Sequence, residues 1–236
     1  MSQTKIVEVI VPFFNDFDNF VRFNEILDEV TTKEIIFLFL DNGSDNNDIQ
    51  DFFNSKNYLN RKLIVSKKNL GYGGGVIYSS KFTNTDYVAW MPGNLKINPK
   101  DAINFFMKEI GDLSKDVLIK AKRTERKPLD YIKTNLFGIL SSIYFTTNLT
   151  DAGGTPIILH KSFFDSTENY PVDFSFDIFV YYYFRKKHLR IRRPSIRYTT
   201  RHAGKSHWQN GIISEVKLTL KIFGYKSQWL TILSKI

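Results

Sequence analysis

The chain has 236 residues, contains no cysteine and carries a formal net charge of +9. The lack of cysteine excludes a disulfide framework and any zinc site built on cysteine thiolates. This length suits one sizeable α/β domain. The sequence shows neither a signal-peptide pattern nor an apolar run long enough to cross a bilayer, so we expect a cytoplasmic protein.

Apolar, strand-like runs alternate with helix-like segments along the first half of the chain. We expect strands at 5–11, 34–40, 62–66, 86–91 and 116–121, and helices at 18–30, 47–54, 74–82 and 99–110. Such alternation is typical of a mainly parallel sheet flanked by helices. In the less regular second half we expect helices at 129–145 and 174–185, strands at 155–159 and 195–200, and two closing helical segments.

The charge is divided unevenly between the two halves. Residues 1–114 hold 12 Lys/Arg and 15 Asp/Glu, whereas residues 115–236 hold 21 and 9, a net charge of +12. A basic half favours an anionic partner such as a pyrophosphate, a lipid phosphate, an anionic membrane leaflet or a nucleic acid. A solvated basic surface without a partner is the alternative.

Turn-forming and polar residues follow three of the expected strands. Pro12–Asp16 follows the first, Asp41–Asp45 the second, and the glycine-rich segment Asn69–Gly75 the third. Ligands of open α/β sheets bind at this carboxyl edge. Glycines permit a close approach of the backbone, and the helix N-terminus beyond them offers N–H groups to an anion. The three segments together predict one crevice, although the glycines alone are also explained by a structural turn.

The ordered set of motifs resembles family 2 glycosyltransferases of the GT-A fold, on the dolichol-phosphate mannosyltransferase-like branch. The resembling segments keep the family's order over residues 5–208. Pro12–Asp16 (Pro-Phe-Phe-Asn-Asp) resembles Pro-x-x-Asn-Glu, Asp41–Ser44 (Asp-Asn-Gly-Ser) resembles Asp-Asp-Gly-Ser, and Asn69–Gly73 has Asn-x-Gly-x-Gly. Ala121–Arg123 (Ala-Lys-Arg) resembles Gly-Ser-Arg, Asp151–Gly154 (Asp-Ala-Gly-Gly) resembles the Asp-x-x-x-Gly segment, and Arg201–Ser206 has Arg-x-x-Gly-x-Ser. The resemblance therefore covers most of the chain.

The metal-binding motif departs from the family pattern. The family's Asp-x-Asp falls on Pro92-Gly93-Asn94. Proline has no ligand atom and asparagine offers only a neutral oxygen, whereas Mg²⁺ prefers carboxylates together with substrate phosphates. We therefore expect Mg²⁺ or Mn²⁺ binding, through Asn94, to be weak or absent.

The resemblance also implies a set of site residues. Those expected to bind the nucleotide are Pro12, Phe14, Asp16, Asp41, Asn69, Gly71, Gly73 and Asn94. Those expected to bind phosphate are Arg123, Arg126, Arg201 and Ser206, since guanidinium groups match phosphate oxygens in pairs. For the arginines a solvated surface position is the alternative, and for Asp41 a turn or helix cap.

Two acidic residues are candidates for the catalytic base. Asp151 precedes a glycine pair, and Asp177 lies in an aromatic-rich helix. A base must reach the proton of the acceptor. An acceptor phosphate is already anionic and needs little base catalysis, so the choice between the two depends on the acceptor.

The implied activity is inverting transfer of a sugar from a nucleotide diphosphate sugar to a lipid-phosphate or glycan acceptor, in surface polysaccharide or glycolipid synthesis. The alternative is a non-catalytic relative that binds nucleotide sugar and assists a partner transferase, which Pro92 and Asn94 favour. Nucleic-acid binding ranks last because no motif for that role is present.

We expect residues 1–210 to form the GT-A domain, with a nucleotide-binding half (1–114) and an acceptor half (115–210), and residues 211–236 to form amphipathic helices. Two stripes at helical spacing support these helices: Ile212, Val216, Leu220 and Phe223, and then Trp229, Ile232, Leu233 and Ile236. Apolar faces flanked by lysines can lie on an anionic membrane, so we predict peripheral contact with the cytoplasmic membrane face through residues 225–236. Packing of the stripes on the core is the alternative.

Overall fold

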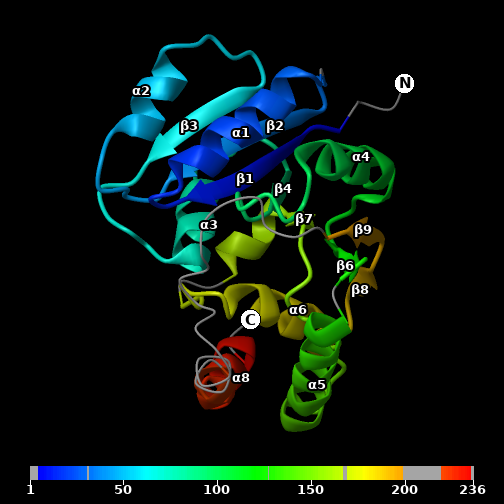
Figure 1. Cartoon of the computed structure of the whole chain (residues 1–236). Coiled ribbons are helices and arrows are strands. Elements are labelled where there is room, and N and C mark those ends of the chain that lie inside the picture. Colours follow the sequence, from blue (N-terminus) through cyan, green and yellow to red (C-terminus); the bar gives the residue numbers. More distant parts are fainter. Residues whose placement is uncertain (1–4, 31, 127, 167–168, 199–218, 235–236) are drawn as a thin grey trace.

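The chain folds around a central sheet that helices cover on both faces (Figure 1). The computed structural model describes residues 5–30, 32–126, 128–166, 169–198 and 219–234. The strands of the main sheet are β1 Val7–Phe13, β2 Ile35–Asp41, β3 Arg61–Val65, β4 Tyr87–Trp90, β5 Val117–Lys120, β7 Ile157–His160 and β8 Arg190–Arg192. Their spatial order is β3-β2-β1-β4-β7-β5-β8. Two short parallel strands, β6 Lys122–Thr124 and β9 Ser195–Arg197, form a separate ribbon.

Most neighbouring strands are parallel. β1 pairs in parallel with β2 and β4, β2 with β3, and β5 with β8. β7 runs antiparallel to both β4 and β5. Its first residue, Ile157, therefore lies beside Trp90 and Lys120, the last residues of β4 and β5. The predicted α/β class with a mainly parallel sheet is confirmed, and the reversal of β7 is an addition that periodicity did not reveal.

Two apolar cores lie on the two faces of the sheet. The helices are α1 Phe17–Asp28, α2 Asp48–Asn54, α3 Tyr72–Ser80, α4 Pro99–Glu109, α5 Pro128–Phe145, α6 Phe176–Lys186 and α8 Lys226–Ser234, with short 3₁₀ turns η1 Ile110–Asp112 and η2 Lys161–Asp165. One core joins α1, α2 and α4 to Val7, Val9 and Val11 of β1. The other joins α3, α6 and α8 to Ile10, Leu38 and Leu40. Side chains that alternate along a strand thus fill both cores.

The first strand continues beyond its expected end. We predicted a strand at 5–11 closed by a turn at Pro12, whereas β1 runs from Val7 to Phe13. Phe13 is buried and packs edge-on against Phe20 and Phe39, with ring centroids 5.1 and 5.9 Å apart. This aromatic packing holds the segment in the sheet, so Pro12 is a strand residue and the turn begins at Phe14.

The other bounds differ by a few residues from those expected. β7 begins at Ile157 and α6 at Phe176, each two residues later than predicted. β9 ends at Arg197, and the predicted remainder of that strand, 199–200, lies outside the described residues. α4 begins as predicted, with Pro99 at its first position and the Asn98 side chain accepting a hydrogen bond from Lys100 N at 2.9 Å.

The C-terminal helix packs on the domain. Trp229 and Ile232 of α8 are buried, and the Trp229 ring stacks on Phe145 at 5.1 Å. Packing on the core, the alternative to membrane contact, therefore holds for Trp229 and Ile232, which are not available to a bilayer, whereas Ile236 lies outside the described residues. Residues 211–218 and the predicted boundary at 210 lie outside the described residues. Within the described part of the chain, no helix has both the length and the apolar character to span a membrane.

Candidate functional site

The carboxyl edge of the parallel strands brings the predicted segments together. The loop after β1 and the loop after β2 are joined by the main chain, with Asn42 N donating to Phe13 O at 2.8 Å. Side chains join them again: Asn15 Nδ2 donates to Asp45 Oδ2 at 2.7 Å, and Asn15 N to Ser44 Oγ at 3.0 Å. Asn15 has a φ of +49°, a conformation that asparagine tolerates better than most residues. Both loops therefore form one edge of the candidate site.

Asp41 closes β2 and is almost fully buried, at 1% exposed. Its Oδ1 accepts from Ser44 N at 3.0 Å and its Oδ2 from Gln50 Nε2 at 3.2 Å. These bonds hold the turn after β2 in shape. A carboxylate has further acceptor capacity after two such bonds, so the predicted contact with a nucleoside remains open to Asp41.

The glycine-rich segment packs closely against the residues that precede α6. Gly71, with a φ of +75°, caps α3, and a Cβ atom there would lie 2.5 Å from Val172 O. A Cβ at Gly73 would lie 2.5 Å from Pro171 O. Gly74 N donates to Val172 O at 2.9 Å, so one N–H group at the start of α3 already has a protein partner. These glycines have a demonstrable packing role, and their predicted nucleotide contacts stay a prediction.

Asn69 holds the same segment through hydrogen bonds of its side-chain amide. Its Oδ1 accepts from Gly71 N at 2.8 Å and from Asn42 Nδ2 at 3.4 Å. Asn42 in turn donates to Gly71 O and accepts from Leu70 N. The loops after β2 and β3 are therefore held by an asparagine pair at the sheet edge.

The segment after β4 does not fit a divalent metal site built on acids. Asn94 Oδ1 accepts a hydrogen bond from Lys96 N at 3.2 Å, and Gly93 is packed against the Phe13 ring. Among the described residues, no group of three acidic, histidine or cysteine side chains could hold a metal ion. Because Mg²⁺ and Mn²⁺ prefer carboxylate oxygens, Asn94 alone is a poor site for either ion.

Arginine side chains surround Asp151 at the other side of this edge. Arg123 donates to Asp151 Oδ1 through Nε at 2.7 Å, and its backbone N donates to Oδ2 at 3.0 Å. Arg126 Nη1 lies 3.7 Å from Oδ1, and Arg193 Nη2 lies 3.4 Å from Oδ2. Their side chains are only 11 to 18% exposed. Three cations thus face one carboxylate, which leaves the cluster positively charged.

The turn that carries Asp151 is fitted tightly to the end of β5. Asp151 has a φ of +48°, and Gly154 N donates to Asp151 O at 3.0 Å. A Cβ atom at Gly154 would lie 2.1 Å from Ala121 O, so glycine is required at that position. The Asp-Ala-Gly-Gly motif therefore has a structural role, because its tight turn holds the Asp151 carboxylate beside Arg123.

Arg193 was not among the residues that the sequence predicted. It follows β8 and also donates to Ala121 O, Thr150 O and Asp151 O. Its guanidinium lies 4.8 Å from the centroid of the Tyr181 ring. The basic run Arg190–Arg193 was visible in the sequence, but nothing in its spacing separates the inward residue from its solvated neighbours.

Asp177, the second predicted base, lies in the first turn of α6 and is buried. Trp90 Nε1 donates to its Oδ1 at 2.8 Å, and Tyr72 OH to its Oδ2 at 3.3 Å. Burial raises the pKa of the Asp177 carboxyl, opposed by the nearby Lys120 ammonium group. Burial and the Asp177 charge raise the pKa of the Tyr72 hydroxyl, which therefore stays a neutral donor.

Lys120, the last residue of β5, lies fully buried between Asp177 and the arginine cluster, and it was also missed from sequence. Its Nζ donates to Gly154 O at 2.7 Å. Burial lowers the pKa of Lys120 to about 7, and the Asp177 charge opposes this shift. A lysine that closes an otherwise apolar strand, Val117–Lys120, was the signal that could have identified it.

Two predicted phosphate ligands, Arg201 and Ser206, lie outside the described residues. Of the remaining predicted residues, Pro12, Phe14 and Asp16 are half-buried at the end of β1. Asp16 Oδ1 accepts from Asn19 Nδ2 at 2.8 Å. Like Asp41, these three residues lie at the carboxyl edge of the sheet, which is where the crevice was predicted.

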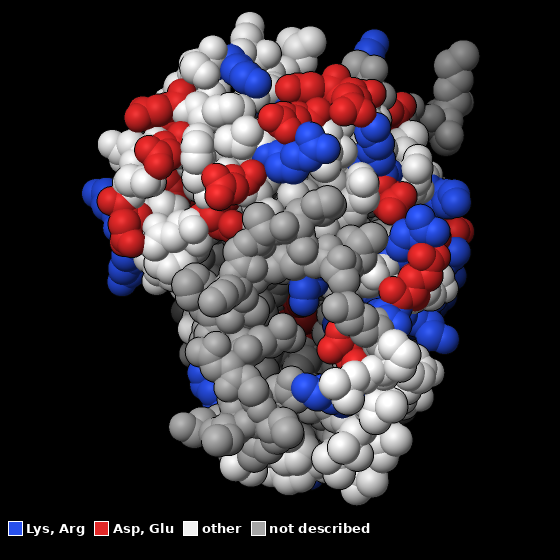
Figure 2. Space-filling view, in the orientation of Figure 1, with Lys and Arg blue, Asp and Glu red and all other residues white. Residues whose placement is uncertain are grey.

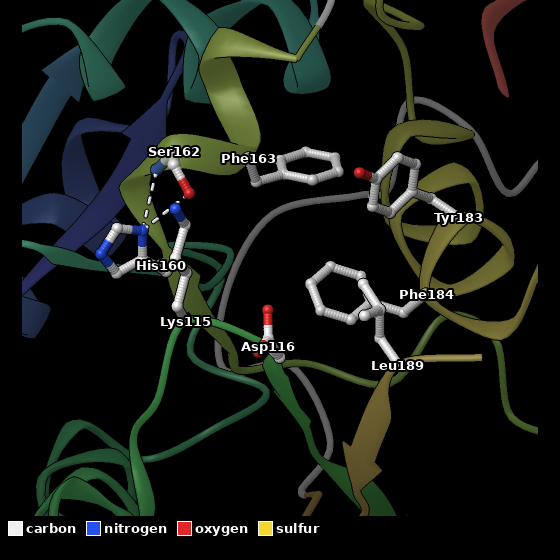
Figure 3. A pocket seen from close by; sticks show the side chains of 8 residues that line it. All are labelled: Lys115, Asp116, His160, Ser162, Phe163, Tyr183, Phe184 and Leu189. Atoms are coloured by element: carbon white, nitrogen blue, oxygen red, sulfur yellow. Dashed lines mark hydrogen bonds between the residues drawn. The ribbon is translucent and has the colours of Figure 1, made fainter. Parts of the chain in front are cut away.

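In the view of Figure 2, basic and acidic side chains lie near one another above α5. A separate pocket of about 140 Å³ lies elsewhere, and Figure 3 shows its lining. It is bounded by Asp116 before β5, His160 at the end of β7 and Leu189 before β8. These residues lie at the amino-terminal edge of the parallel strands, so the pocket is distinct from the candidate site.

Comparison with solved structures supports the fold. A mycobacterial protein superposes with a TM-score of 0.68 at 15% identity, over 93% of this chain and 75% of that chain. Glucosyl-3-phosphoglycerate synthase from Mycobacterium tuberculosis, bound to Mn²⁺, UDP and phosphoglyceric acid, superposes with a TM-score of 0.69 at 12% identity, over 93% and 79% of the two chains. The same enzyme with Mn²⁺, UDP and glucosyl-3-phosphoglycerate gives 0.67 at 11% identity, over 93% and 80%.

These likenesses confirm the GT-A fold, and at such low identity they concern the fold alone. No curated protein sequence matches the chain. The family model of glycosyl transferase family 2 does match, over residues 8–167, which is more than half of the chain. That range contains the loops after β1 and β2, the glycine-rich segment and the Asp151 turn. The chain therefore belongs to glycosyl transferase family 2.

Proposed function

We propose that this glycosyltransferase family member moves a sugar from a nucleotide diphosphate sugar to a lipid-phosphate or glycan acceptor, with inversion at the anomeric carbon. The observation that carries the proposal is the arginine cluster around Asp151, formed by Arg123, Arg126 and Arg193. Three guanidinium groups at the carboxyl edge of the sheet suit a dianionic or trianionic ligand such as a diphosphate. Support also comes from the fold neighbour that binds UDP and phosphoglyceric acid.

In the proposed reaction an acceptor oxygen attacks the anomeric carbon, and the bond from that carbon to the diphosphate oxygen breaks. The electron pair of the broken bond stays on the diphosphate, whose added negative charge the arginine cluster stabilises. A phosphate acceptor brings its own negative oxygen and loses no proton. The residues at Pro92-Gly93-Asn94 do not fit a metal ion, so in this proposal the arginines supply the positive charge.

A hydroxyl acceptor would lose a proton, and the two predicted bases differ in their surroundings. The Asp151 carboxylate is already engaged by three arginines, which suits it to anchoring them. Burial raises the pKa of the Asp177 carboxyl, a direction that suits a proton acceptor, but Trp90 and Tyr72 occupy its oxygens. We therefore favour a phosphate acceptor, which needs neither residue as a base.

A second candidate function is non-catalytic binding of a nucleotide sugar in support of a partner transferase. The engagement of Asn94 by Lys96 N and of Asp151 by the arginines favours it, since both leave fewer free groups for chemistry. Both candidates place the protein in surface polysaccharide or glycolipid synthesis. Both also place it in the cytoplasm, with peripheral contact to the cytoplasmic membrane face.

Calorimetric titration with a panel of nucleoside diphosphates, in EDTA, tests the shared binding step. We expect Arg126→Gln and Arg193→Gln each to weaken binding about tenfold, since a hydrogen bond to a charged group contributes about 1.5–3 kcal/mol. The matched control is Arg197→Gln, because Arg197 pairs with Glu125 at an exposed position. Equal affinity in all three variants would refute a diphosphate site at the cluster. Turnover of labelled nucleotide sugars then separates the transferase from the non-catalytic binder.

A further inference from the structure

Helix α5 presents its large apolar side chains to solvent. The exposed residues are Leu129, Tyr131, Ile132, Leu136, Ile139, Leu140, Ile143 and Tyr144, with Ile143 71% exposed. Leu129, Ile132, Leu136, Ile139 and Ile143 recur at spacings of three and four, so they form one stripe along the helix. An 18-residue helix is about 27 Å long, and the stripe follows most of that length.

The inward face of α5 is narrow. Its buried residues are Gly138, Ser141 and Phe145. A Cβ atom at Gly138 would lie 3.2 Å from Thr150 Cα, so the helix backbone lies close to the segment that leads to Asp151. Gly138, Ser141 and Phe145 thus face the domain, while most of the large apolar residues face outward, which is the reverse of a helix that only fills a core.

This exposure distinguishes α5 from the other helices. α1 buries Phe20, Phe23 and Leu27, and α8 buries Trp229 and Ile232. Figure 2 shows the α5 surface, in the lower part of the view, as almost entirely uncharged. Contiguous apolar surface of this kind on a protein marks a site of interaction.

Cations lie at both ends of the exposed face. At its start, Arg126 Nη2 donates to Asp130 O at 2.9 Å. At its end, Lys226 Nζ lies 4.6 Å from the centroid of the Tyr144 ring and donates to Tyr144 O. Lys186 Nζ donates to Thr146 Oγ1 at 3.2 Å, just beyond the helix. The helix itself carries one aspartate and one lysine, whose charges cancel. The cations at its two ends therefore make the surroundings of the face positive.

We propose that the exposed face of α5 docks on the surface of a membrane that contains anionic lipid. The apolar stripe would enter the headgroup–acyl boundary, while Lys186 and Lys226 meet anionic headgroups. Tyr131 and Tyr144, near the two ends, have the apolar ring and polar hydroxyl that suit this interface. A second copy of the chain is a poorer occupant, because cations lie at both ends of this face, Arg126 at one and Lys186 and Lys226 at the other, so either helix orientation would bring like charges together.

The orientation of α5 links this surface to the candidate site. Arg126 contacts the first turns of α5 and also lies 3.7 Å from Asp151 Oδ1. A membrane on the α5 face would therefore lie beside the arginine cluster. This inference rests on the proposed function, because the proximity matters only if the arginine cluster binds the diphosphate. It deepens that function by favouring an acceptor whose phosphate is carried by a lipid.

The absence of cysteine allows one label at one position. We would place an environment-sensitive NBD fluorophore at Ile139→Cys in the full chain and titrate it with vesicles of phosphatidylcholine, with and without phosphatidylglycerol. We expect blue-shifted, enhanced emission with the anionic vesicles at low salt, and a weaker response at high salt. The matched control is Leu59→Cys, an exposed position between α2 and β3, where no response is expected.

Cosedimentation provides the second measurement. We expect Ile132→Ser combined with Ile139→Ser to lower the vesicle-bound fraction of the chain about tenfold, because two apolar side chains no longer enter the interface. Leu59→Ser with Phe82→Ser, exposed outside α5 and outside residues 211–236, is the control. Circular dichroism and nucleoside diphosphate titration without vesicles should be unchanged in both double variants, which separates this test from that of the proposed function.

Three results would overturn the proposal. The first is an Ile139 label that does not respond to anionic vesicles. The second is an equal response to neutral vesicles, which would remove the role of the lysines. The third is a dimer in analytical ultracentrifugation that Ile139→Ser dissociates, which would show that a second copy covers this face.

Discussion

The guanidinium group of Arg193 donates to both the main-chain carbonyl and the carboxylate of Asp151, at 3.1 and 3.4 Å. The two residues lie 42 positions apart in the sequence. Arg123 of β6, which follows β5, approaches the same carboxylate. Asp151 therefore gathers arginines from two separate segments, and the excess of positive charge faces the carboxyl edge of the sheet.

Asp151→Asn should destabilise the fold, because it leaves three partly buried arginines without their shared anion. We expect the free energy of unfolding to fall by about 2–3 kcal/mol, less than for a fully buried pair because the cluster retains some exposure. Urea unfolding followed by circular dichroism measures this change. Asp45→Asn, at an exposed position, is the control and should cost less than about 1 kcal/mol. Equal midpoints for the two variants would show that Asp151 does not anchor the arginines.

Asp41→Ala should weaken nucleotide diphosphate binding while the domain stays folded. The variant removes the acceptor of Ser44 N and Gln50 Nε2, so the turn after β2 loses its shape, and any nucleoside contact of the carboxylate is lost with it. Calorimetry should show a loss of affinity of about tenfold or more. Asp51→Ala, on the exposed face of α2, should bind like the parent chain. An unchanged affinity of Asp41→Ala would remove this residue from the site.

Nucleotide binding should depend little on divalent metal. The reason is the Pro92-Gly93-Asn94 segment, in which the one oxygen-bearing side chain already accepts from Lys96 N. Titration of UDP with Mn²⁺, with Mg²⁺ and with EDTA should give affinities within about threefold of one another. A steep metal requirement that Asn94→Ala abolishes would show that asparagine and phosphate oxygens suffice, and our expectation would be wrong.

Lys120 should make stability rise with pH above neutrality. Its pKa is about 7 in the folded chain against 10.5 ordinarily, so between these values the unfolded chain binds the proton and the folded chain does not. Deprotonation therefore favours the folded state, with a slope of at most about 1.4 kcal/mol per pH unit. Below pH 7 both states hold the proton and the cost of burying the charge is fully present.

The measurement is the free energy of urea unfolding from pH 7 to 10, compared between the parent chain and Lys120→Met. Methionine does not titrate, so the difference between the two curves should shrink or reverse as pH rises. The tyrosines with raised pKa values ionise later and are common to both proteins. Parallel curves over this range would show that Lys120 keeps its proton in the folded chain.

Most strands and helices could be predicted from the sequence because each repeats its own apolar pattern locally, whereas the three-residue strands β6 and β8 were not predicted. Continuous apolar runs predicted β1 and β2, and the polar residues after them predicted the edge at which Asn15 meets Ser44 and Asp45. The weak metal binding expected from Pro92-Gly93-Asn94 rests likewise on neighbouring residues and remains a prediction. These properties depend on neighbouring residues in the chain, so no long-range contact was needed to infer them. The dolichol-phosphate mannosyltransferase-like branch remains a prediction.

The site's charge balance was decided only by the tertiary structure. The sequence shows Arg193 as one of several basic residues and Lys120 as one polar end of a strand, and their meeting depends on β8 and β7 lying beside β5. The same is true of the two apolar helices: α8 and α5 have comparable stripes, yet the core covers Trp229 and leaves Ile143 exposed. Periodicity reports that a face is apolar, whereas burial depends on which other segment is there to cover it.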